Sequence, residues 1–452
     1  MTSQTAHQQG YTLVVGLGVT GLSVVRYLSG LGEHIVVVDS RDIPPSLNAL
    51  KTEFPEIEYH MGTFDKAMFT GAGRIILSPG VPLSEPVVMS AKDAGIEICG
   101  DMDLFAHVVS APVIGITGSN GKSTVTALLG EMAKRAGMDV AVGGNIGTPV
   151  LDLLDASHQL YVLELSSFQL ETLNNLPMLA SVVLNISPDH LDRYADITAY
   201  AMSKQAIYAS TQHAVINLDD EIASQGIDLS DGNEKQVTAF TLGKPESGQY
   251  GVCEDDSGSR YLCFGEEKLI AVDALKIKGN HNVSNALAAL SLGSCAGLPI
   301  QAMLDALVEF SGLAHRTQWV AEVNGVNWFN DSKATNVGAA IAAIKGLPGK
   351  HVLIAGGEGK GADFSALREV ASDHLRKVVL IGKDAKKIET ALAGDVICEN
   401  AANMKEAVSI AAQAACHGDN VLLSPACASL DMYDNFEQRG DDFIGSVRAL
   451  LL

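Results

Sequence analysis

Residues 115–124 read GITGSNGKST, Gly115-Ile-Thr-Gly-Ser-Asn-Gly-Lys-Ser-Thr124, and this stretch decides how the middle of the chain is interpreted. An apolar run, Val113–Thr117, precedes the turn, and a helical pattern follows from about Lys122 to Arg135. A strand that enters a glycine-rich turn and then a helix offers unpaired amides to an anion. Lys122 adds a positive charge, and Ser123 or Thr124 can ligate Mg²⁺. The stretch therefore predicts a phosphate-binding loop.

The loop departs from the usual P-loop spelling, G-x-x-x-x-G-K-[ST]. Counting back from Gly121 gives Ile116 where that pattern has its first glycine, and the glycines stand at Gly115 and Gly118 instead. The alternative is a turn with a helix cap. A capped turn does not require a lysine followed by two hydroxyl residues, so we favour phosphate binding.

Length and composition limit the classes of protein to consider. The chain has 452 residues, 47% of them hydrophobic, and exceeds the ~250–300 residues at which a single core stops growing. A net charge of −22, with no cluster of Lys or Arg, argues against nucleic-acid and membrane partners. Small anionic ligands remain possible, and no obligatory protein partner is indicated.

The cysteines and the ends of the chain point to the cytoplasm. Seven scattered cysteines without a C-x-x-C pair argue against a disulfide framework and against a zinc site. The first ten residues, MTSQTAHQQG, have neither the basic nor the apolar region of a signal peptide. The longest uncharged run, Val283–Leu304, contains glycines and a proline, and it predicts a buried helix and a turn.

Apolar runs that alternate with helical stretches predict three α/β domains with parallel sheets, at residues 1–100, 101–312 and 313–452. The first and third are expected to be Rossmann-like, and the second a P-loop-type ATPase domain. Residues 233–275 carry short alternating stretches that predict a small antiparallel portion of the central domain. The expected strands of the three domains are 12–15, 35–38, 74–77, 113–117, 160–163, 182–184, 319–323, 326–329, 351–355, 377–381 and 420–423. Asn324-Gly325, between two of these strands, predicts a two-residue hairpin turn.

Polar motifs follow many of these strands, where ligands lie in open α/β sheets. Glu164 ends the strand 160–163 and could hold a metal, although a strand-end Glu is more often solvated. His190 lies between two carboxylates in PDHLD, residues 188–192, and a metal or phosphate role and a structural role are equally weighted.

The first domain carries a dinucleotide-type fingerprint. GLGVTG, residues 16–21, follows the first strand, and Asp39 stands 18 residues after the last glycine. Taken alone, this pattern indicates NAD. A nucleotide sugar offers the same diphosphate and ribose, so both ligands stay open. In the third domain, Lys333, Lys360 and Ser429 could hold carboxylates or phosphate, although each alone is more often a surface residue.

Together these motifs resemble the Mur ligases, the ATP-dependent amide ligases of peptidoglycan precursor synthesis. The motifs that carry the resemblance stand in the family's order over nearly the whole chain: GSNGKST (118–124), GGNIG (143–147), ELSSFQLE (164–171), NISPDHLDRY (185–194), GNHNVSNALAA (279–289), AHR (314–316) and NDSKATN (330–336). GLGVTGLS, LSPACASLD and NFEQRG resemble the members that add D-glutamate. Ser187-Pro188 departs from a Thr-Glu-like pair expected in some members.

The resemblance implies an enzyme that joins D-glutamate to UDP-N-acetylmuramoyl-L-alanine at the expense of ATP. It implies that the first domain and the facing edge of the second bind the UDP substrate through Val19, Thr20, Asp39, Ser40, Arg41, Gly80, Asn145, Ser166 and Gln169. ATP would be bound by Gly118, Ser119, Asn120, Gly121, Lys122, Ser123, Thr124, Asn282, Asn285, Arg316 and Asp331. The implied D-glutamate pocket consists of His315, Lys333, Thr335, Lys360, Ser429, Leu430 and Phe436.

The resemblance also implies a catalytic set of Lys122, His190, Lys204 and Asn145, together with two Mg²⁺ ions. Ser123 and Glu164 would hold one ion, and His190 together with a carbamylated Lys204 the other. From the residues alone, Lys204 would be a solvated helix residue.

Four alternatives remain at this point. An NAD-dependent oxidoreductase would explain the first fingerprint and leave the Lys122 loop unexplained. A regulatory nucleotide switch often carries an N-K-x-D motif, which this chain lacks. A folylpolyglutamate-type ligase would not need the first domain. Another amino-acid-adding ligase of the same superfamily is the nearest alternative, and the absence of a D-N-P-R tetrapeptide argues against the members that add the next residue.

Overall fold

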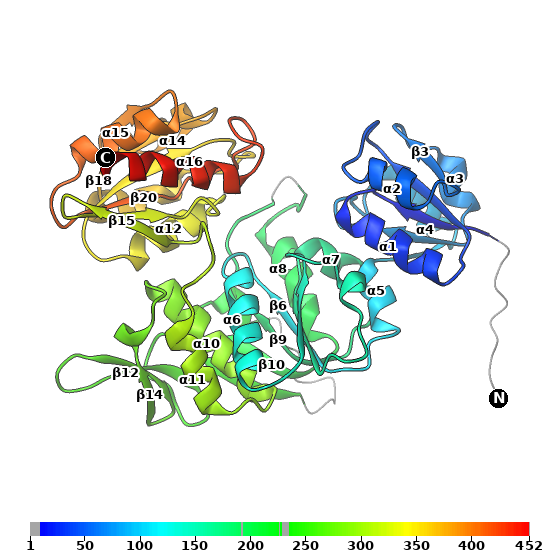
Figure 1. Ribbon diagram of the computed structural model, residues 1–452, viewed down its shortest axis with the longest axis horizontal. Helices are drawn as coiled ribbons and strands as arrows, with labels where there is room; N and C mark the ends of the chain where they lie inside the picture. Colours follow the sequence, from blue (N-terminus) through cyan, green and yellow to red (C-terminus); the bar gives the residue numbers. More distant parts are fainter. Residues whose placement is uncertain (1–9, 191–192, 226, 228–234, 452) are drawn as a thin grey trace.

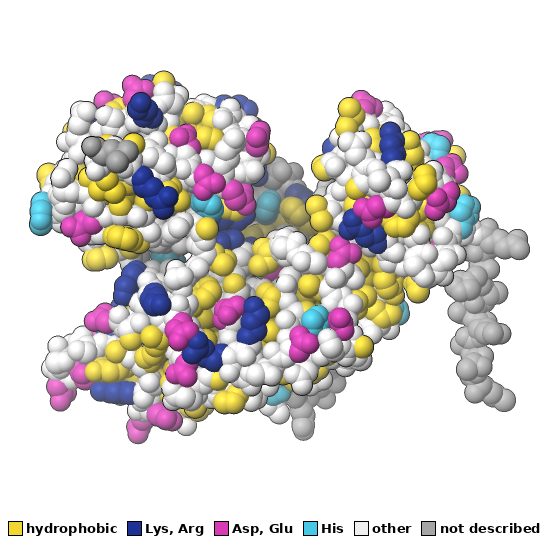
Figure 2. All heavy atoms as spheres, in the orientation of Figure 1, with side chains coloured by type: hydrophobic (Ala, Val, Ile, Leu, Met, Phe, Trp, Pro, Cys, Tyr) yellow, Lys and Arg dark blue, Asp and Glu magenta, His cyan; other side chains and the backbone are white. Residues whose placement is uncertain are grey.

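The computed structural model describes residues 10–190, 193–225, 227 and 235–451. In chain order the protein forms a first, a central and a third body (Figure 1). The first and third bodies stand apart from each other on the same side of the central body, so the chain presents two separate junctions. Figure 2 shows a deep notch between the outer bodies, with basic and histidine side chains at its base.

The first body is a parallel sheet in the order β3-β2-β1-β4-β5, as the Rossmann-like prediction requires. The three predicted strands are present. β3 and β5 were not predicted, because β3 reads EYHM and is mostly exposed and β5 has only three residues. The elements are β1 (Thr12–Val15), α1 (Val19–Gly30), β2 (Ile35–Asp39), α2 (Leu47–Glu53), β3 (Glu58–Met61), α3 (Lys66–Gly71), β4 (Arg74–Leu77), α4 (Pro86–Asp93) and β5 (Glu97–Cys99).

The central body is built on one nine-stranded sheet, in the order β14-β13-β12-β11-β10-β9-β6-β8-β7. Its strands are β6 (Val113–Thr117), β7 (Val140–Gly144), β8 (Leu160–Glu164), β9 (Met178–Val183), β10 (Thr211–Asn217), β11 (Gln236–Phe240), β12 (Tyr250–Glu254), β13 (Arg260–Phe264) and β14 (Glu267–Ala271). Its helices are α5 (Asp101–Ala106), α6 (Lys122–Arg135), η1 (Val150–Leu153), α7 (Ser167–Thr172), α8 (Ile197–Gln205), η2 (Ala206–Tyr208), α9 (Glu221–Ser224), η3 (Val272–Ala274), α10 (Asn280–Cys295) and α11 (Ile300–Glu309).

The antiparallel prediction for residues 233–275 is only partly right. β12, β13 and β14 are antiparallel, but β11 pairs in parallel with both β10 and β12. The strand pattern did not show that β11 continues the main sheet, because short alternating runs look alike in either pairing. Residues 233–234 of the predicted range lie outside the described residues.

The third body is a six-stranded sheet in the order β15-β16-β20-β17-β18-β19. The predicted hairpin at Asn324-Gly325 is confirmed: both residues have positive φ, 54° and 76°, as a two-residue turn of this kind requires. The elements are β15 (Gln318–Val323), β16 (Val326–Asn330), α12 (Val337–Gly346), β17 (His351–Gly356), η4 (Ser365–Leu367), α13 (Arg368–His374), β18 (Leu375–Ile381), α14 (Ala385–Ala391), β19 (Cys398–Asn400), α15 (Met404–Ala414), β20 (Asn420–Leu423), α16 (Phe436–Arg448) and η5 (Ala449–Leu451).

The two junctions are packed differently. One apolar cluster runs from the first body, including Leu17 and Leu28, through Phe105 into the central body at Tyr161. The Phe105 and Tyr161 rings meet edge to face, with centroids 5.2 Å apart. The third body has apolar clusters of its own, which contain no residue of the central body. The first junction is therefore part of a shared core, and the second is not.

The cysteines differ from the prediction at one pair. Cys253 on β12 and Cys263 on β13 are joined by a disulfide, because the antiparallel register brings them to neighbouring positions. A separation of ten residues carries no such signal until the hairpin is known. The run Val283–Leu304 forms parts of α10 and α11 with a turn between them, as predicted. Among the described residues, no helix has the length and apolar character needed to cross a membrane.

Candidate active site

The predicted phosphate loop joins β6 to α6 at the carboxyl edge of the central sheet. Gly121 caps the helix with a φ of 86°, and a Cβ there would lie 2.3 Å from Asn285 Oδ1, so only glycine fits. The next strand-end segment holds the loop in place. The Ser119 amide donates to the Asn185 carbonyl at 2.9 Å, and the Asn120 amide donates to Asn185 Oδ1 at 2.8 Å. The loop is thus a rigid cradle whose helix begins at Lys122.

Lys122 folds back over this cradle. Its Nζ donates to the Gly118 carbonyl at 2.8 Å and to the Ser119 carbonyl at 3.0 Å. Burial lowers the pKa of the Lys122 ammonium, while Glu164 and Asp189 act in the opposite direction. A cation is therefore held at the loop by backbone oxygens.

Ser123 and Glu164 lie side by side, because β6 and β8 are neighbours in the sheet. Ser123 Oγ donates to Glu164 Oε2 at 2.6 Å, and Asn145 Nδ2 donates to Glu164 Oε1 at 2.7 Å. A hydroxyl and a carboxylate are oxygen donors of the kind that Mg²⁺ takes from proteins, so this pair fits a magnesium ion that also binds phosphate. Arg316 of the third body reaches the same place: its Nη2 donates to Ser123 Oγ at 2.7 Å.

Lys204 is not the solvated residue that its position in the sequence suggested. Its side chain is 2% exposed, and its Nζ lies 4.8 Å from the centroid of the Tyr200 ring. Burial, with Lys122 nearby, holds the pKa of Lys204 well below its ordinary value. The sequence could not show this, because α8 has almost no amphipathic pattern and its burial depends on packing against α7.

His190 approaches the same region from the segment after β9. Its backbone is left-handed, with φ 54°, and its ring meets Phe168 edge to face at 4.8 Å. Tyr200 lies 6.4 Å from the His190 ring, and its hydroxyl is 3.1 Å from Ser119 Oγ. His190 and Lys204 therefore flank one tyrosine that also touches the phosphate loop. Within the described parts of the chain, no group of three or more His, Cys, Asp or Glu side chains is arranged to hold a metal.

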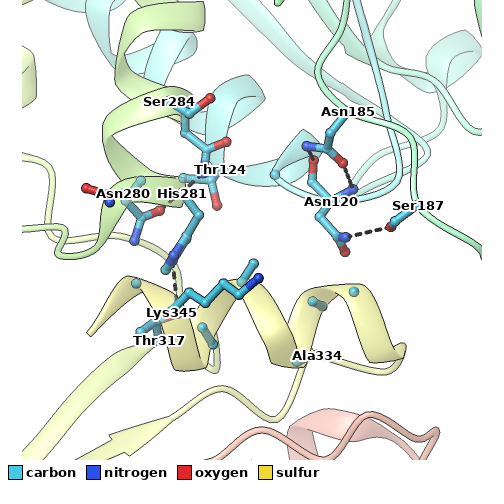
Figure 3. Close-up of a pocket in the computed structure, with 18 of the residues that line it drawn as sticks. Asn120, Thr124, Asn185, Ser187, Asn280, His281, Ser284, Thr317, Ala334 and Lys345 are labelled. Atoms are coloured by element: carbon cyan, nitrogen blue, oxygen red, sulfur yellow. Dashed lines mark hydrogen bonds between the residues drawn. The ribbon is translucent and has the colours of Figure 1, made fainter. Parts of the chain in front are cut away.

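A cavity of about 510 Å³ lies between the central and third bodies (Figure 3). Among the predicted nucleotide residues, it is lined by Asn120, Gly121, Thr124, Asn282, Asn285, Arg316 and Asp331, and Lys333 of the predicted amino-acid pocket joins them. Burial raises the pKa of the Asp331 carboxyl to about 7, although Ser424 Oγ donates to it at 2.8 Å.

Sequence reasoning missed several residues of this cavity. His281 and Thr317 face each other across the junction, with Nε2 and Oγ1 3.3 Å apart (Figure 3). Burial lowers the pKa of His281 to about 4, so the imidazole is neutral. His281 lies inside the quoted GNHN motif, which was a usable signal. Thr317 had none, because only the packing of the third body against the central body brings it to His281.

A cavity of about 470 Å³ lies at the first junction, between the first and central bodies. We call it the first cavity, and we call the cavity between the central and third bodies the second cavity. Of the nine residues predicted for the UDP substrate, eight line the first cavity: Val19, Thr20, Asp39, Ser40, Arg41, Gly80, Asn145 and Gln169. The ninth, Ser166, does not line the cavity but caps α7, and its Oγ accepts from the Gln169 amide at 3.2 Å. The lining also includes Ser78 and Pro79, which were not predicted.

Both oxygens of the Asp39 carboxylate, which lines the first cavity, accept hydrogen bonds. The Leu17 amide donates to it at 2.7 Å, and the Arg41 side chain donates to both of its oxygens at 2.8 and 2.6 Å. Burial alone would raise the pKa of Asp39, but these donors outweigh it and the pKa is lowered. The carboxylate is therefore ionised and fixed at the end of β2.

The predicted amino-acid pocket is assembled in part. The Lys333 Nζ lies 4.0 Å from the centroid of the Phe436 ring, and the His315 ring meets Phe436 edge to face at 6.1 Å. Burial and neighbouring Arg316 lower the pKa of Lys333 to about 8. The other four residues lie on loops: Thr335 donates its amide to Lys333 at 2.8 Å, Lys360 follows β17, and Ser429 and Leu430 follow β20.

Arg439 is a further residue of this region that was not predicted. Although charged, it is 1% exposed, and it donates to both the hydroxyl and the carbonyl of Ser332 and to the Cys427 carbonyl. Burial lowers its pKa to about 10. It ties the loop that carries Lys333 to the loop that carries Ser429, and the quoted NFEQRG motif contains it.

Comparison with protein families matches three stretches of the chain. Residues 10–100 match the Mur ligase MurD-like N-terminal domain, residues 116–293 the Mur ligase middle domain, and residues 315–427 the Mur ligase glutamate ligase domain. Together the three matches span most of the chain, in the order of the three bodies.

Curated relatives match over nearly the full length. The UDP-N-acetylmuramoylalanine--D-glutamate ligase of Nitrosococcus oceani is 51% identical over 443 residues, 97% of each chain. The protein of the same name from Pseudomonas aeruginosa is 50% identical over 444 residues, 97% of this chain and 98% of its own.

Solved structures share the fold at low sequence identity. A pseudomurein peptide ligase type C from Methanothermus fervidus has a TM-score of 0.60 at 18% identity, covering 98% of this chain and 99% of its own. The UDP-N-acetylmuramate-alanine ligase MurC from Thermotoga maritima has a TM-score of 0.56 at 18% identity, covering 98% and 100%. These likenesses support the three-body α/β architecture.

Proposed function

This chain belongs to the Mur ligase family, and we propose that it is an ATP-dependent ligase that joins D-glutamate to UDP-N-acetylmuramoyl-L-alanine in peptidoglycan precursor synthesis. The observation that carries the proposal is the identity of about half of all residues, over 97% of the chain, with relatives named for this reaction. The oxidoreductase alternative fails, because it leaves the central and third bodies unused.

We propose a division of labour that follows the two cavities. Residues 1–100 hold the UDP part in the cavity at the first junction, with Asp39 positioned for the ribose hydroxyls. Residues 101–312 hold ATP on the loop of residues 118–124, and residues 313–452 close over it and bring D-glutamate. Lys333, Lys360 and Ser429 supply the cationic and hydroxyl donors that a substrate with two carboxylates needs.

The first step is transfer of the γ-phosphoryl group from ATP to the alanine carboxylate. Catalysis of phosphoryl transfer consists mainly of positioning and charge stabilisation. Lys122 would release its two backbone carbonyls and donate to the transferred phosphoryl group, and the amides of the loop would orient the triphosphate. Ser123 and Glu164 would hold a Mg²⁺ ion, which supplies positive charge against the phosphates when it is bound.

In the second step the uncharged amine of D-glutamate attacks the acyl phosphate, and phosphate leaves the tetrahedral intermediate. Because water would destroy an acyl phosphate, the cavity must be closed before the first step. Arg316, Thr317 and Lys333 reach this cavity from the third body, so closure and assembly of the site are a single event.

We propose that a second Mg²⁺ ion is held by His190 and Lys204, as the resemblance implies. An ammonium cannot bind a cation, whereas addition of CO₂ to the amine makes a carboxylate-like ligand. Lys204 is buried beside Tyr200. This position supports the proposal, because a lysine without a role in the site would extend into solvent. Lys204→Ala is expected to lose activity and to regain part of it with added acetate or formate. Full activity of the variant without either anion would refute the assignment.

The function is tested by phosphate release from ATP and Mg²⁺ in the presence of UDP-N-acetylmuramoyl-L-alanine. Release that requires D-glutamate, and does not occur with L-glutamate, is the expected result. Release that is triggered instead by another amino acid would assign the chain to a different ligase of the family. Release without any amino acid would favour a nucleotide switch.

A further inference from the structure

Arg193 is a largely buried guanidinium that bonds to the wall of the first cavity, and the mechanism above does not use it. Its side chain is 14% exposed, and that of its partner Glu171 is 16% exposed. Nη2 donates to Glu171 Oε2 at 2.6 Å, and Nη1 donates to the Pro79 carbonyl at 3.0 Å. The guanidinium carbon lies 4.1 Å from the centroid of the Phe168 ring. One face and two edges of the guanidinium are therefore engaged.

We propose that Arg193 is a positioning residue for the UDP-linked substrate, which fastens the first-body wall of the substrate cavity to the central body. The inference rests on the proposed function. In this proposal Arg193 does not contact the substrate. It holds the two walls of the substrate cavity at a fixed separation.

The contact on the first body is at the cavity wall itself. Ser78, Pro79 and Gly80 follow β4 and line the cavity beside the GLGVTG loop. Within the first body, the Ser78 hydroxyl donates to the Gly16 carbonyl at 3.0 Å. Arg193 adds a bond from the central body to the next residue of the same turn. A diphosphate bound between this first-body wall and the central body needs the two walls at a fixed spacing, because hydrogen bonds act only at short range.

The contacts on the central body involve helix α7, which supplies the opposite wall. Phe168 and Glu171 flank Gln169, and Gln169 lines the cavity. Glu171 is held by two consecutive residues, since the Tyr194 hydroxyl donates to its other carboxylate oxygen. Arg193 thus connects two walls of the same cavity, the turn at Pro79 and the helix α7 that carries Gln169.

The same cluster reaches the phosphate side of the site. Phe168 lies between Arg193 and His190, whose ring is 4.8 Å from it. A change at Arg193 therefore shifts a ring that also orients His190. The primary effect should still be on the UDP substrate, because both hydrogen bonds of Arg193 lead to walls of that cavity and neither leads to the ATP cavity.

The chemistry of the contact requires arginine. A planar guanidinium can stack on a ring while it donates in two directions, whereas an ammonium is a compact charge on a flexible stem. Arg193→Lys keeps the charge beside Glu171 and loses the planar fork, so it tests geometry without leaving a buried carboxylate unpaired. Glu171→Gln is a second variant, which keeps an amide oxygen as the acceptor for Arg193 and removes the charge.

A structural ion pair with no role in binding is the competing explanation. Arg74 provides a matched control, since it pairs with Glu33 at 2.6 Å inside the first body, away from both cavities, at 28% and 30% exposure. Arg74→Lys should lower thermal stability about as much as Arg193→Lys and leave substrate binding unchanged. Melting temperatures of all variants identify any that fail to fold.

The experiment measures binding of UDP-N-acetylmuramoyl-L-alanine by calorimetry, without ATP or Mg²⁺, and then the KM values for this substrate and for ATP. We expect Arg193→Lys to weaken substrate binding by about tenfold, the size of one lost charge-assisted hydrogen bond, and Glu171→Gln to weaken it less. The KM for ATP should change by less than about twofold, since no ATP contact is lost.

The outcomes separate this inference from the proposed function. If the wild-type chain does not bind the UDP substrate, the proposed function fails and this inference with it. If the wild-type chain binds and Arg193→Lys binds equally well, only the role of Arg193 is refuted. Equal increases in the KM for ATP and for the UDP substrate would also refute it, because they would indicate a general structural effect.

Discussion

The two junctions of the molecule are built by opposite means. The first and central bodies share an apolar cluster, and the Phe105–Tyr161 contact lies within it. The central and third bodies meet through polar contacts at the mouth of a cavity. Arg316 bonds to Ser123, Thr317 approaches His281, and Asn336 Nδ2 donates to Asp189 Oδ2 at 3.0 Å. Opening a shared apolar core exposes its surface to water, whereas exchange of polar contacts for water costs far less.

This difference suggests what each junction does. The shared apolar core and Arg193 hold the first cavity open at a fixed width. A cavity of fixed width suits a substrate that binds before any chemistry. The second is closed by contacts that use the groups proposed to bind phosphate and metal. Arg316 donates to the Ser123 hydroxyl and Lys122 to the carbonyls of its own loop. These contacts must give way when a nucleotide binds, so the third body is the part expected to move.

The largest effect should follow from Lys122→Ala, which removes the cation of the phosphate loop and no residue that lines the first cavity. Loss of one group that stabilises developing charge costs about 10²–10³-fold in turnover. Binding of the UDP substrate should stay at the wild-type level, as calorimetry can measure. The control is Lys134→Ala on the same helix, whose exposed ammonium pairs with Glu131. Wild-type turnover of the Lys122 variant would remove the basis of the proposed mechanism.

Arg316→Ala should have the next largest effect, because it removes both a phosphate donor and a contact that closes the second junction. The KM for ATP should rise by roughly tenfold to a hundredfold, as expected for a hydrogen bond to a charged group. Arg368→Ala, which removes an exposed guanidinium that pairs with Asp395, should leave the KM for ATP unchanged. A rise in the KM for the UDP substrate alone would contradict the assignment of Arg316 to the second cavity.

The comparison also predicts which body moves. Small-angle scattering should give a different radius of gyration for the free chain and for the chain with ATP, Mg²⁺ and the UDP substrate. Hydrogen exchange should then show changed protection in the loops around Arg316 and Thr317, and little change near Phe105. Identical scattering from the free and the bound sample would argue against closure by the third body.

The smallest predicted effect concerns the pH dependence of the second junction. The pKa of Asp331 is about 7 in the folded chain, against an ordinary value of 3.8. Between pH 3.8 and about pH 7 the folded state binds more protons than the unfolded state, so the free energy of unfolding falls as the pH rises. Asp331→Asn removes this contribution and should reduce the loss of melting temperature between about pH 4 and about pH 7 by a few degrees.

The control for this prediction is the exposed Asp273, whose replacement by Asn should leave the pH slope of the melting temperature unchanged. The buried Asp101, with a pKa raised to about 6, contributes a slope of the same sign in both variants. An unchanged slope in Asp331→Asn would show that this carboxyl is ionised in the fold at neutral pH.

Much of the site could be predicted because its residues are local to single motifs. Gly121, Lys122 and Ser123 occupy consecutive positions after a strand, and Glu164 ends the neighbouring strand of the same sheet. Hydrophobic periodicity and glycine positions carry that information. The Asn324-Gly325 turn is local in the same way, whereas the eight residues that line the first cavity were implied by the resemblance to the Mur ligases.

The residues that escaped prediction depend on contacts between distant segments. Lys204 looked solvated because α8 has no apolar stripe, and its burial comes from packing against α7. Arg193 was quoted only as part of a motif, since its partners Pro79 and Glu171 are distant in the sequence and one belongs to another body. β11 was expected within the antiparallel portion, because pattern alone does not distinguish parallel from antiparallel neighbours.

The sequence by itself determined the three α/β units, the strand–loop–helix that ends in Lys122, and the order of motifs that marks a Mur ligase, because each is encoded in residues close together in the chain. Tertiary structure alone decided which cations face which cavity and how the two junctions differ. Burial and pairing at those places depend on surfaces that segments more than a hundred residues apart bring together.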